Sequence, residues 1–334
     1  MSREFLAVDA GNSKTVAVVC TATGEITGRG RADAGDIYAA AGAAAAVGQV
    51  STAVHAALTD AGTTVAGIDH AAFRLAGIDW ADDDAFWDAA VKTSFPDLRS
   101  WSVKNDGFAL VRLASLTGAG VSVIAGTGAA IAARGPGGSE FSVSWWVQDG
   151  IGGVSLGDAA FRTVVRANLG IDPPTCLTPR LLEVFGCRDV ASLLELFTRR
   201  VDALPGPEKR RAARAVLGAA DEGDPTAVRI VADQARSCAE YAAAAAHRTG
   251  FDLAADRVPV ALGGSLMTSE HAVLRTATTR ELVQLMGRVD VEGTTAPPVV
   301  GAALDALAEG GADPTEQVRT ALIDAVHPGG FLQT

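Results

Sequence analysis

The stretch FLAVDAGNSKTVAVVC, residues 5–20, places a short polar turn between two apolar runs. The apolar runs predict two paired strands, and the small polar residues between them predict the connecting turn. Gly11 lets backbone N–H groups approach phosphate oxygens closely, while Lys14 and Thr15 add a charge and a hydroxyl. Asp9, at the end of the first strand, is placed to hold Mg²⁺ through water. The same residues suit an ordinary hairpin turn, so this stretch alone leaves both interpretations open.

The stretch VSVIAGTGAAIAARG, residues 121–135, repeats the pattern of apolar strand, small turn and apolar strand. Its turn, Gly126-Thr127-Gly128, suits a phosphate loop or a tight turn. Ile131 occupies the place of the third glycine of a dinucleotide-binding fingerprint, so that motif is not supported. The first turn likewise lacks the spacing of a P-loop. Two such turns in matching contexts predict two related halves with a cleft between them.

Strands alternate with helices through most of the chain, which predicts an α/β fold. The boundary between the halves is expected near 112–120, where small and polar residues gather. The chain is expected to be mostly helical beyond Gly153. Besides the two strands around the turn at 126–128, the expected strands are 5–8, 16–20, 26–31, 71–75, 101–104 and 258–264. The expected helices include 37–60, 82–94, one ending near 116, 225–248, and two closing helices within 296–307 and 314–325.

Length, charge and cysteine content exclude several classes of function. The chain has 334 residues, of which 48% are hydrophobic, and this is enough for two domains or one large one. A net charge of −11 argues against a general nucleic-acid partner. No apolar run is long enough to span a membrane and no signal-peptide pattern is present, so we expect a cytoplasmic protein. Four scattered cysteines without paired spacing predict reduced thiols rather than a zinc or iron–sulfur site: Cys20, Cys176, Cys187 and Cys238.

Asp106 is the strongest candidate for a catalytic group. In WSVKNDGFAL it follows a short strand, and ligands of open α/β sheets bind at such strand ends. A carboxylate there can take a proton from an attacking hydroxyl. Locally, a helix cap explains Asp106 equally well. Asp149, in VQDGIGG, has the same two interpretations.

The segment Gly153–Gly157 fits the G-x-S-x-G pattern of a hydrolase nucleophile elbow. Glycines rather than an apolar strand precede it, and no histidine has a telling context, so the hydrolase interpretation is not favoured. Ser155 is better explained as a helix cap, with Asp158 completing a capping box.

Taken together, the motifs resemble those of the N-acetylglucosamine kinase and BadF/BadG/BcrA/BcrD ATPase family, within the superfamily of sugar kinases, heat-shock chaperones and actin. Six segments carry the resemblance in the right order and span most of the chain. They are DAGNSKT (9–15), LAGID (75–79), NDGFAL (105–110), AGTGAA (125–130), QDGIGG (148–153) and VALGGSL (260–266).

The resemblance implies two ribonuclease-H-like domains around a central cleft, the second with added helices. The expected division is 1–114 and 115–334, with the last helices packing back on the first domain. ATP and Mg²⁺ are the implied cofactors and a sugar is the implied substrate, with Asp106 as general base and Asp9 organising the metal. The implied nucleotide contacts are Asp9, Gly11, Asn12, Ser13, Lys14, Thr15, Gly126, Thr127, Gly128, Gly263 and Gly264. The implied sugar contacts are Asp36, Gly77, Asp79, Asn105, Asp106 and Asp149.

The chain departs from the family pattern at several of these positions. Asp36 replaces an asparagine that binds sugar in many relatives, which exchanges a donor and acceptor for an acceptor alone. A carboxylate there favours the ammonium of an unacetylated amino sugar over an acetamide. The other departures are Asn12 for glycine, Ala129 for serine, Gln148 for glycine and Gly150 for glutamate or tryptophan.

The sequence therefore predicts an ATP-dependent kinase acting on the 6-hydroxyl of an amino sugar such as glucosamine or N-acetylglucosamine, and similar proteins suggest a homodimer. One alternative is an ATPase of the same fold that activates a partner reductase. Such activators hold an iron–sulfur cluster with cysteines, which the spacing here does not favour. A second alternative is a sugar-sensing module without catalysis.

Overall fold

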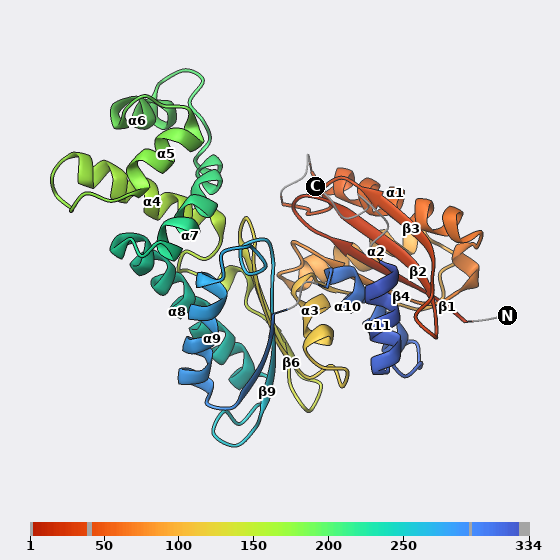
Figure 1. Ribbon diagram of the computed structural model, residues 1–334. Coiled ribbons are helices and arrows are strands. Elements are labelled where there is room, and N and C mark those ends of the chain that lie inside the picture. Colours follow the sequence, from red (N-terminus) through yellow and green to blue (C-terminus); the bar gives the residue numbers. More distant parts are fainter. Residues whose placement is uncertain (1–2, 39–41, 294–295, 327–334) are drawn as a thin grey trace.

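The computed structural model describes residues 3–38, 42–293 and 296–326, and two five-stranded sheets form its centre (Figure 1). The first sheet contains β1 (Glu4–Ala10), β2 (Thr15–Thr21), β3 (Ile26–Ala32), β4 (Ile68–Leu75) and β5 (Trp101–Asn105). Their order is β3-β2-β1-β4-β5. β1 pairs antiparallel with β2 and parallel with β4, so the first polar turn lies at the carboxyl end of a parallel pair. Ligands of open α/β sheets bind at this edge.

The second sheet repeats this arrangement. It contains β6 (Gly120–Ala125), β7 (Ala129–Arg134), β8 (Glu140–Ser142), β9 (Val258–Gly263) and β10 (Val289–Gly293). Its order, β10-β9-β6-β7-β8, matches the first sheet when read from the opposite edge. β6 pairs antiparallel with β7 and parallel with β9, as β1 does with β2 and β4. The prediction of two related α/β halves is confirmed.

Helices from both halves fill the space between the sheets (Figure 1). α3 (Gly107–Ala114) packs on β6, β7 and β9 of the second sheet, and α10 (Pro298–Glu309) packs on β1 and β4 of the first. The two helices pack against each other, and α11 (Glu316–Ala325) follows α10. Each sheet is thus covered by a helix from the other half of the chain. The division into 1–114 and 115–334 stays a prediction.

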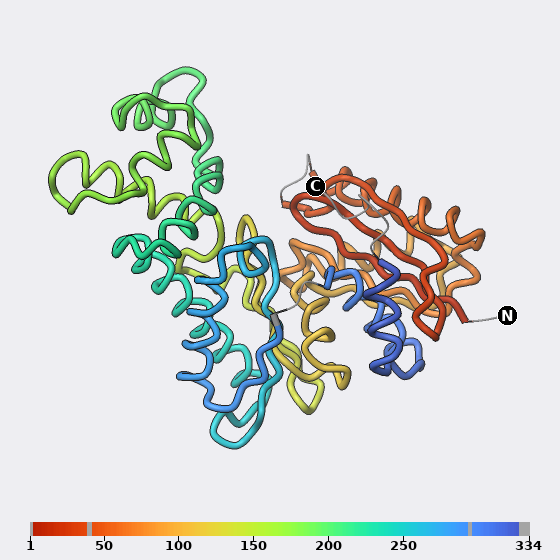
Figure 2. The backbone as a smooth tube through the Cα atoms, in the orientation of Figure 1, coloured from red at the N-terminus to blue at the C-terminus, as the bar shows by residue number. Residues whose placement is uncertain are grey.

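The remaining helices cover the outer faces. α1 (Ala43–Ala61) packs on the first sheet, and α2 (Ala81–Ser94) contacts β5. α8 (Pro225–Arg248) packs on β6 and β7, and α9 (Val273–Met286) contacts α8 and β10. α4 (Gly153–Asn168), α5 (Leu177–Phe185), α6 (Val190–Thr198) and α7 (Ala213–Asp221) extend the second half away from the sheets, in green in Figure 2. The expected added helices are therefore present.

A buried carboxylate ties the two sheets together through the central helices. Asp305, on α10, accepts hydrogen bonds from Arg74 Nη2 at 2.8 Å, Arg112 Nε at 2.8 Å and Arg134 Nη1 at 3.2 Å. These arginines lie on β4, α3 and β7 respectively. Burial raises the pKa of Asp305, but the arginines outweigh it and hold that pKa below its usual value.

Three local predictions differ from the structure. The capping box is wrong: α4 begins at Gly153, its N-cap is Gly152, and no side chain caps it, so Ser155 lies inside the first turn. The short strands β8 and β10 were not expected. The Ala-rich helix begins at Ala43 rather than near 37, and residues 39–41 within the predicted range lie outside the described residues.

Among the described residues, no helix combines the length and the apolar character that crossing a bilayer requires.

Candidate active site

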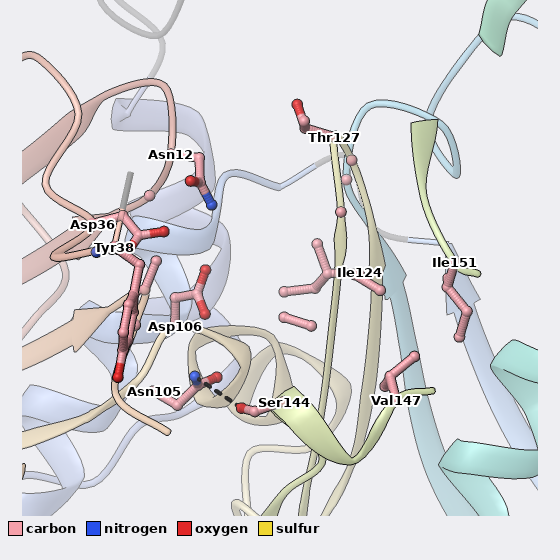
Figure 3. A pocket seen from close by; sticks show the side chains of 18 of the residues that line it. Asn12, Asp36, Tyr38, Asn105, Asp106, Ile124, Thr127, Ser144, Val147 and Ile151 are labelled. Atoms are coloured by element: carbon pink, nitrogen blue, oxygen red, sulfur yellow. Dashed lines mark hydrogen bonds between the residues drawn. The ribbon is translucent and has the colours of Figure 1, made fainter. Parts of the chain in front are cut away.

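The two polar turns meet at one cleft between the halves, with a volume of about 740 Å³. In Figure 3, Asn12, Asp36 and Asp106 lie on one side and Ile124, Thr127 and Ile151 on the other. Every predicted site residue lines this cleft except Thr15 and Gly263. The structure therefore brings these residues together in one cleft, and their functions stay predictions.

The first turn joins β1 to β2. The backbone N–H of Gly11 donates to the carbonyl of Lys14 at 3.0 Å, which closes the turn. Thr15 is fully buried, and its hydroxyl donates to the backbone oxygen of Asp33 at 2.8 Å. This hydroxyl therefore supports the turn from behind and does not face the cleft.

The second turn rests on the N-terminus of α4. The N–H of Gly153 donates to Gly126 O at 2.8 Å, and the N–H of Val154 donates to Thr127 O at 3.1 Å. Gly152 has φ +102°, and a Cβ there would lie 2.6 Å from backbone atoms of Gly128. This close approach explains Gly152 of QDGIGG, which lets the segment dock onto the turn.

Open space surrounds the glycines of both turns. A Cβ at Gly126 or Gly128 would meet nothing within 4 Å, and one at Gly11 would meet only a backbone oxygen at 4.0 Å. None of these three has a positive φ. Protein packing therefore does not require glycine there, whereas close approach of a phosphate would.

Gly263 and Gly264 have a different role. A Cβ at Gly264, which has φ +87°, would lie 2.5 Å from the carbonyl oxygen of Ala125 at the base of the second turn. A Cβ at Gly263 would collide with the side chain of Leu110. Packing accounts for both glycines, and only Gly264 reaches the cleft.

Asp106 lies between β5 and α3 and faces the cleft (Figure 3). Its side chain does not cap α3. The cap bond comes instead from Asn105, whose Oδ1 accepts from the N–H of Gly107 at 2.9 Å. The structure thus shows no side-chain cap bond from Asp106, whose carboxylate faces the cleft.

The pKa of Asp106 is raised to about 7. Burial is the main cause, and the nearby carboxylates of Asp9, Asp36 and Asp79 add to it. Burial likewise raises the pKa of Asp9 to about 7, opposed by the charge of Lys14. A concentration of carboxylates at the bottom of a cleft is the environment in which a cation is most stabilised.

The donor set at Asp9 suits magnesium. Among the described residues, no three His, Cys, Asp or Glu side chains are grouped so that they could hold a metal ion by themselves. Mg²⁺ is usually held by one or two carboxylates together with substrate phosphates and water. Asp9 fits that mode of binding, because it lines the same cleft as two glycine turns that can hold phosphates.

The predicted sugar contacts form one wall. Asp36 is buried, and its Oδ1 accepts from the N–H of Tyr38 at 2.8 Å. Gly77 has φ +79° and leaves room for Asp36, since a Cβ there would lie 2.7 Å from Asp36 Oδ1. Asn105 Nδ2 donates to Asp79 Oδ1 at 3.1 Å, so part of the polar capacity of this wall already holds the wall together.

Sequence reasoning missed two aromatic residues that line the cleft, and a third that hydrogen-bonds the cleft residue Asp149. Tyr38 and Trp145 pack edge to face with ring centroids 5.9 Å apart, yet each is more than half exposed, at 54% and 56%. They come from opposite halves and meet at the cleft. Tyr241, on α8, donates to Asp149 Oδ2 at 3.0 Å and accepts from the N–H of Gln148 at 2.9 Å. The exposed Trp145-Trp146 pair beside QDGIGG was a signal that could have been used.

Solved structures with the same fold include sugar kinases. A protein from Chromobacterium violaceum, provisionally assigned as an N-acetylglucosamine kinase, has a TM-score of 0.66 and 24% identity over 91% of this chain and 98% of its own. A Porphyromonas gingivalis protein with the same provisional assignment has a TM-score of 0.61 and 18% identity, with coverages of 91% and 98%. A ROK family glucokinase from Streptomyces griseus, solved with glucose and AMPPNP, has a TM-score of 0.51 and 18% identity, with coverages of 90% and 98%.

These likenesses confirm the predicted two-domain actin-like fold. A comparison with curated proteins gave no match. The family model of the BadF/BadG/BcrA/BcrD ATPases matches residues 6–175, which is half of the sequence and contains both polar turns and Asp106. The chain therefore belongs to the BadF/BadG/BcrA/BcrD ATPase family.

Proposed function

We propose that the protein is an ATP-dependent sugar kinase that phosphorylates an amino sugar, at its 6-hydroxyl. One observation carries the proposal: two glycine turns from related half-chains and the uncapped carboxylate of Asp106 line the same cleft. Membership of an ATPase family and a fold shared with sugar kinases support it.

The nucleotide would lie between the turns. Gly11, Gly126 and Gly128 have the open backbone that phosphate oxygens need, and Asp9 is the group best suited to hold Mg²⁺. Bound Mg·ATP supplies the phosphoryl group to be transferred. Gly264 and Ser265 also line the cleft, and adenosine is expected beside them.

Asp106 would act as the general base. With a pKa of about 7, its carboxylate is partly ionised at neutral pH and more basic than an ordinary Asp, which suits it to take a proton from a sugar hydroxyl. Because phosphoryl transfer needs little covalent help from a protein, holding the hydroxyl beside Asp106 is the main task of the acceptor wall.

The acceptor wall suits an amino sugar. Tyr38 and Trp145 expose ring faces on which the apolar face of a sugar ring can pack. The carboxylates of Asp36, Asp79 and Asp106 favour a hydroxyl donor or an ammonium over an anion.

The reductase-activator alternative finds no support in the cysteines. All four are free thiols, with Cys20 and Cys238 buried. An exposed cluster of cysteines at one surface, as an iron–sulfur cluster between subunits would need, is not formed by these residues.

A coupled ADP-release assay with glucose, glucosamine and N-acetylglucosamine tests the proposal. We expect sugar-dependent ADP release that Asp106→Asn abolishes and that Asp82→Asn, an exposed carboxylate on α2 outside the cleft, leaves unchanged. ADP release without sugar and unaffected by Asp106→Asn would favour an ATPase. Sugar-induced thermal stabilisation without ADP release would favour a sensing module.

A further inference from the structure

A second cleft, of about 550 Å³, lies between α4 and α8. It shares Asp149, Gly150 and Ser155 with the candidate active site, so the two clefts adjoin along the 149–150 segment. Gly264 and Ser265, which line the expected adenosine end, do not line it. It therefore adjoins the active-site cleft at Asp149, one of the expected sugar contacts.

Gln234 on α8 gives this second cleft an unsatisfied polar group. Its side chain lines the cleft and is only 4% exposed. Neither its Nε2 nor its Oε1 has a hydrogen-bond partner among the described residues. An amide buried without partners is unfavourable by a few kcal/mol, on the order of 1–3 per group, so a retained one calls for a partner from outside.

The charges of the second cleft select against anions. Asp149, Asp158 and Asp233 line it, with Arg162 as its only cationic lining residue among those described. Asp158 is already paired, accepting from Lys209 Nζ at 2.7 Å and Arg162 Nη2 at 2.9 Å. The net field is negative, which disfavours phosphate and favours neutral or cationic ligands.

The rest of the lining matches a sugar ring. Val154, Leu156 and Ile230 supply apolar surface, and Ser155 and Ser237 supply hydroxyls. Apolar surface with a few convergent polar groups is the usual composition of a small-molecule site. The amide of Gln234 can both donate to and accept from a hydroxyl or an acetamido group.

We propose that the α4/α8 cleft is a subsite for the second ring of a disaccharide acceptor, in which Gln234 hydrogen-bonds that ring. The acceptor is then an amino-sugar disaccharide rather than a monosaccharide alone. This inference rests on the proposed sugar-kinase function, because it extends the acceptor side of the same site.

The test compares glucosamine and N-acetylglucosamine with their β-1,4-linked disaccharides as acceptors for the full-length protein. We expect KM for the better disaccharide to be roughly 10-fold below that of its monosaccharide, as one or two additional hydrogen bonds would give. Gln234→Met should remove that advantage and leave monosaccharide kinetics unchanged. Arg236→Met, on an exposed position of the same helix outside both clefts, should change neither.

A second variant tests the proposed subsite without changing Gln234. Ala159→Phe places a ring in the α4/α8 cleft and should reduce disaccharide turnover while monosaccharide turnover persists. Disaccharides that are phosphorylated no better than monosaccharides, or a Gln234→Met protein that keeps the full advantage, would overturn the subsite but not the kinase. If no sugar is phosphorylated at all, the kinase proposal fails. Thermal shift with the same sugars then decides the subsite: a disaccharide-specific shift lost in Gln234→Met supports it, and equal shifts overturn it.

Discussion

The side-chain oxygen of Asn105 accepts a hydrogen bond from the backbone N–H of Gly107 at 2.9 Å and so caps α3. The neighbouring Asp106, whose position in the sequence also allowed it to cap the helix, makes no side-chain cap bond. Asn105 therefore supports the helix, and Asp106 is the residue to which we assign the proposed chemistry.

This division predicts opposite effects of two neighbouring substitutions. Asp106→Asn should lower sugar phosphorylation by about 10²-fold or more, because the general base is lost, without lowering the free energy of unfolding. Asn105→Ala should lower the free energy of unfolding by roughly 1–3 kcal/mol, because it removes the cap and the bonds to Ile78 and Asp79. Urea denaturation and ADP release measure the two effects. A large loss of stability in Asp106→Asn would contradict the assignment.

The raised pKa values predict how stability depends on pH. Asp9 and Asp106 have pKa values of about 7 in the folded protein, above the 3.8 of an unperturbed Asp, so the folded state retains protons that the unfolded state has lost. Their contribution to stability therefore falls as pH rises from about 4 to 7.

The difference in unfolding free energy between Asp106→Asn and the unmodified protein isolates this effect. From pH 4 to pH 7 the free energy of unfolding of Asp106→Asn should increase relative to that of the unmodified protein. Urea denaturation at several pH values measures both. Mg²⁺ should raise Tm more at pH 8 than at pH 5, and Asp9→Asn should weaken that rise. If this difference in unfolding free energy does not change from pH 4 to 8, the pKa of Asp106 is not raised by burial.

The glycines of the second turn predict a separation of binding from folding. Gly128→Ala should leave Tm within a few degrees, because the added Cβ meets open space, but it should raise the KM for ATP by obstructing phosphate approach. Gly152→Ala should lower the free energy of unfolding by roughly 1–3 kcal/mol, because its φ of +102° is strained for alanine and its Cβ would meet Gly128. Thermal denaturation and ATP titration in the coupled assay distinguish these effects. Equal destabilisation by both variants would argue that the turn, and not a ligand, requires Gly128.

The buried Asp305 predicts a large effect far from the cleft. Asp305→Asn leaves Arg74, Arg112 and Arg134 without their shared counter-charge and should lower the free energy of unfolding by about 3–5 kcal/mol. Asp290→Asn, which breaks the exposed pair with Arg257, should lower it by less than about 1 kcal/mol. Urea denaturation of the two variants checks the contrast. A small effect at Asp305 would mean that the other carboxylate partners, Glu309 for Arg74 and Glu140 for Arg134, are sufficient counter-charges.

The sequence predicted the elements whose signals are local. β1, β2, β6 and β7 are apolar strands around small turns. α8 begins at Pro225, directly after its N-cap Asp224, and both residue types are typical of a helix start. β8 was missed because three residues give too short a pattern to distinguish from a loop. β10 was missed although the equally short β5 was predicted.

The site was predicted less completely, for a physical reason. A motif shows that Asp106 and Asn105 are both able to cap, but only the direction of each side chain decides which one does. Tyr241 is 92 residues from Asp149 and Gln234 lies on the same helix, so no local pattern connects them to the cleft. The duplicated turns were detectable because each is complete within one hairpin.

Asp36 predicts which amino sugar is preferred. Its Oδ1 accepts from the N–H of Tyr38 at 2.8 Å, and an asparagine could keep that bond while losing the negative charge. The turn should therefore survive Asp36→Asn, and the change should fall on substrate choice.

Because hydrogen bonds to charged groups contribute about 1.5–3 kcal/mol, kcat/KM for glucosamine should fall roughly 10- to 100-fold in Asp36→Asn, while that for N-acetylglucosamine stays the same or rises. Asp33→Asn, an exposed carboxylate of the same loop outside the cleft, serves as the control and should leave the ratio unchanged. The ratio is measured at pH 7, where the amine is protonated, with thermal denaturation to verify the fold. An unmodified protein that phosphorylates N-acetylglucosamine but not glucosamine would exclude the ammonium as the partner of Asp36. The carboxylate would then be expected to accept from a sugar hydroxyl, and Asp36→Asn would weaken both sugars alike.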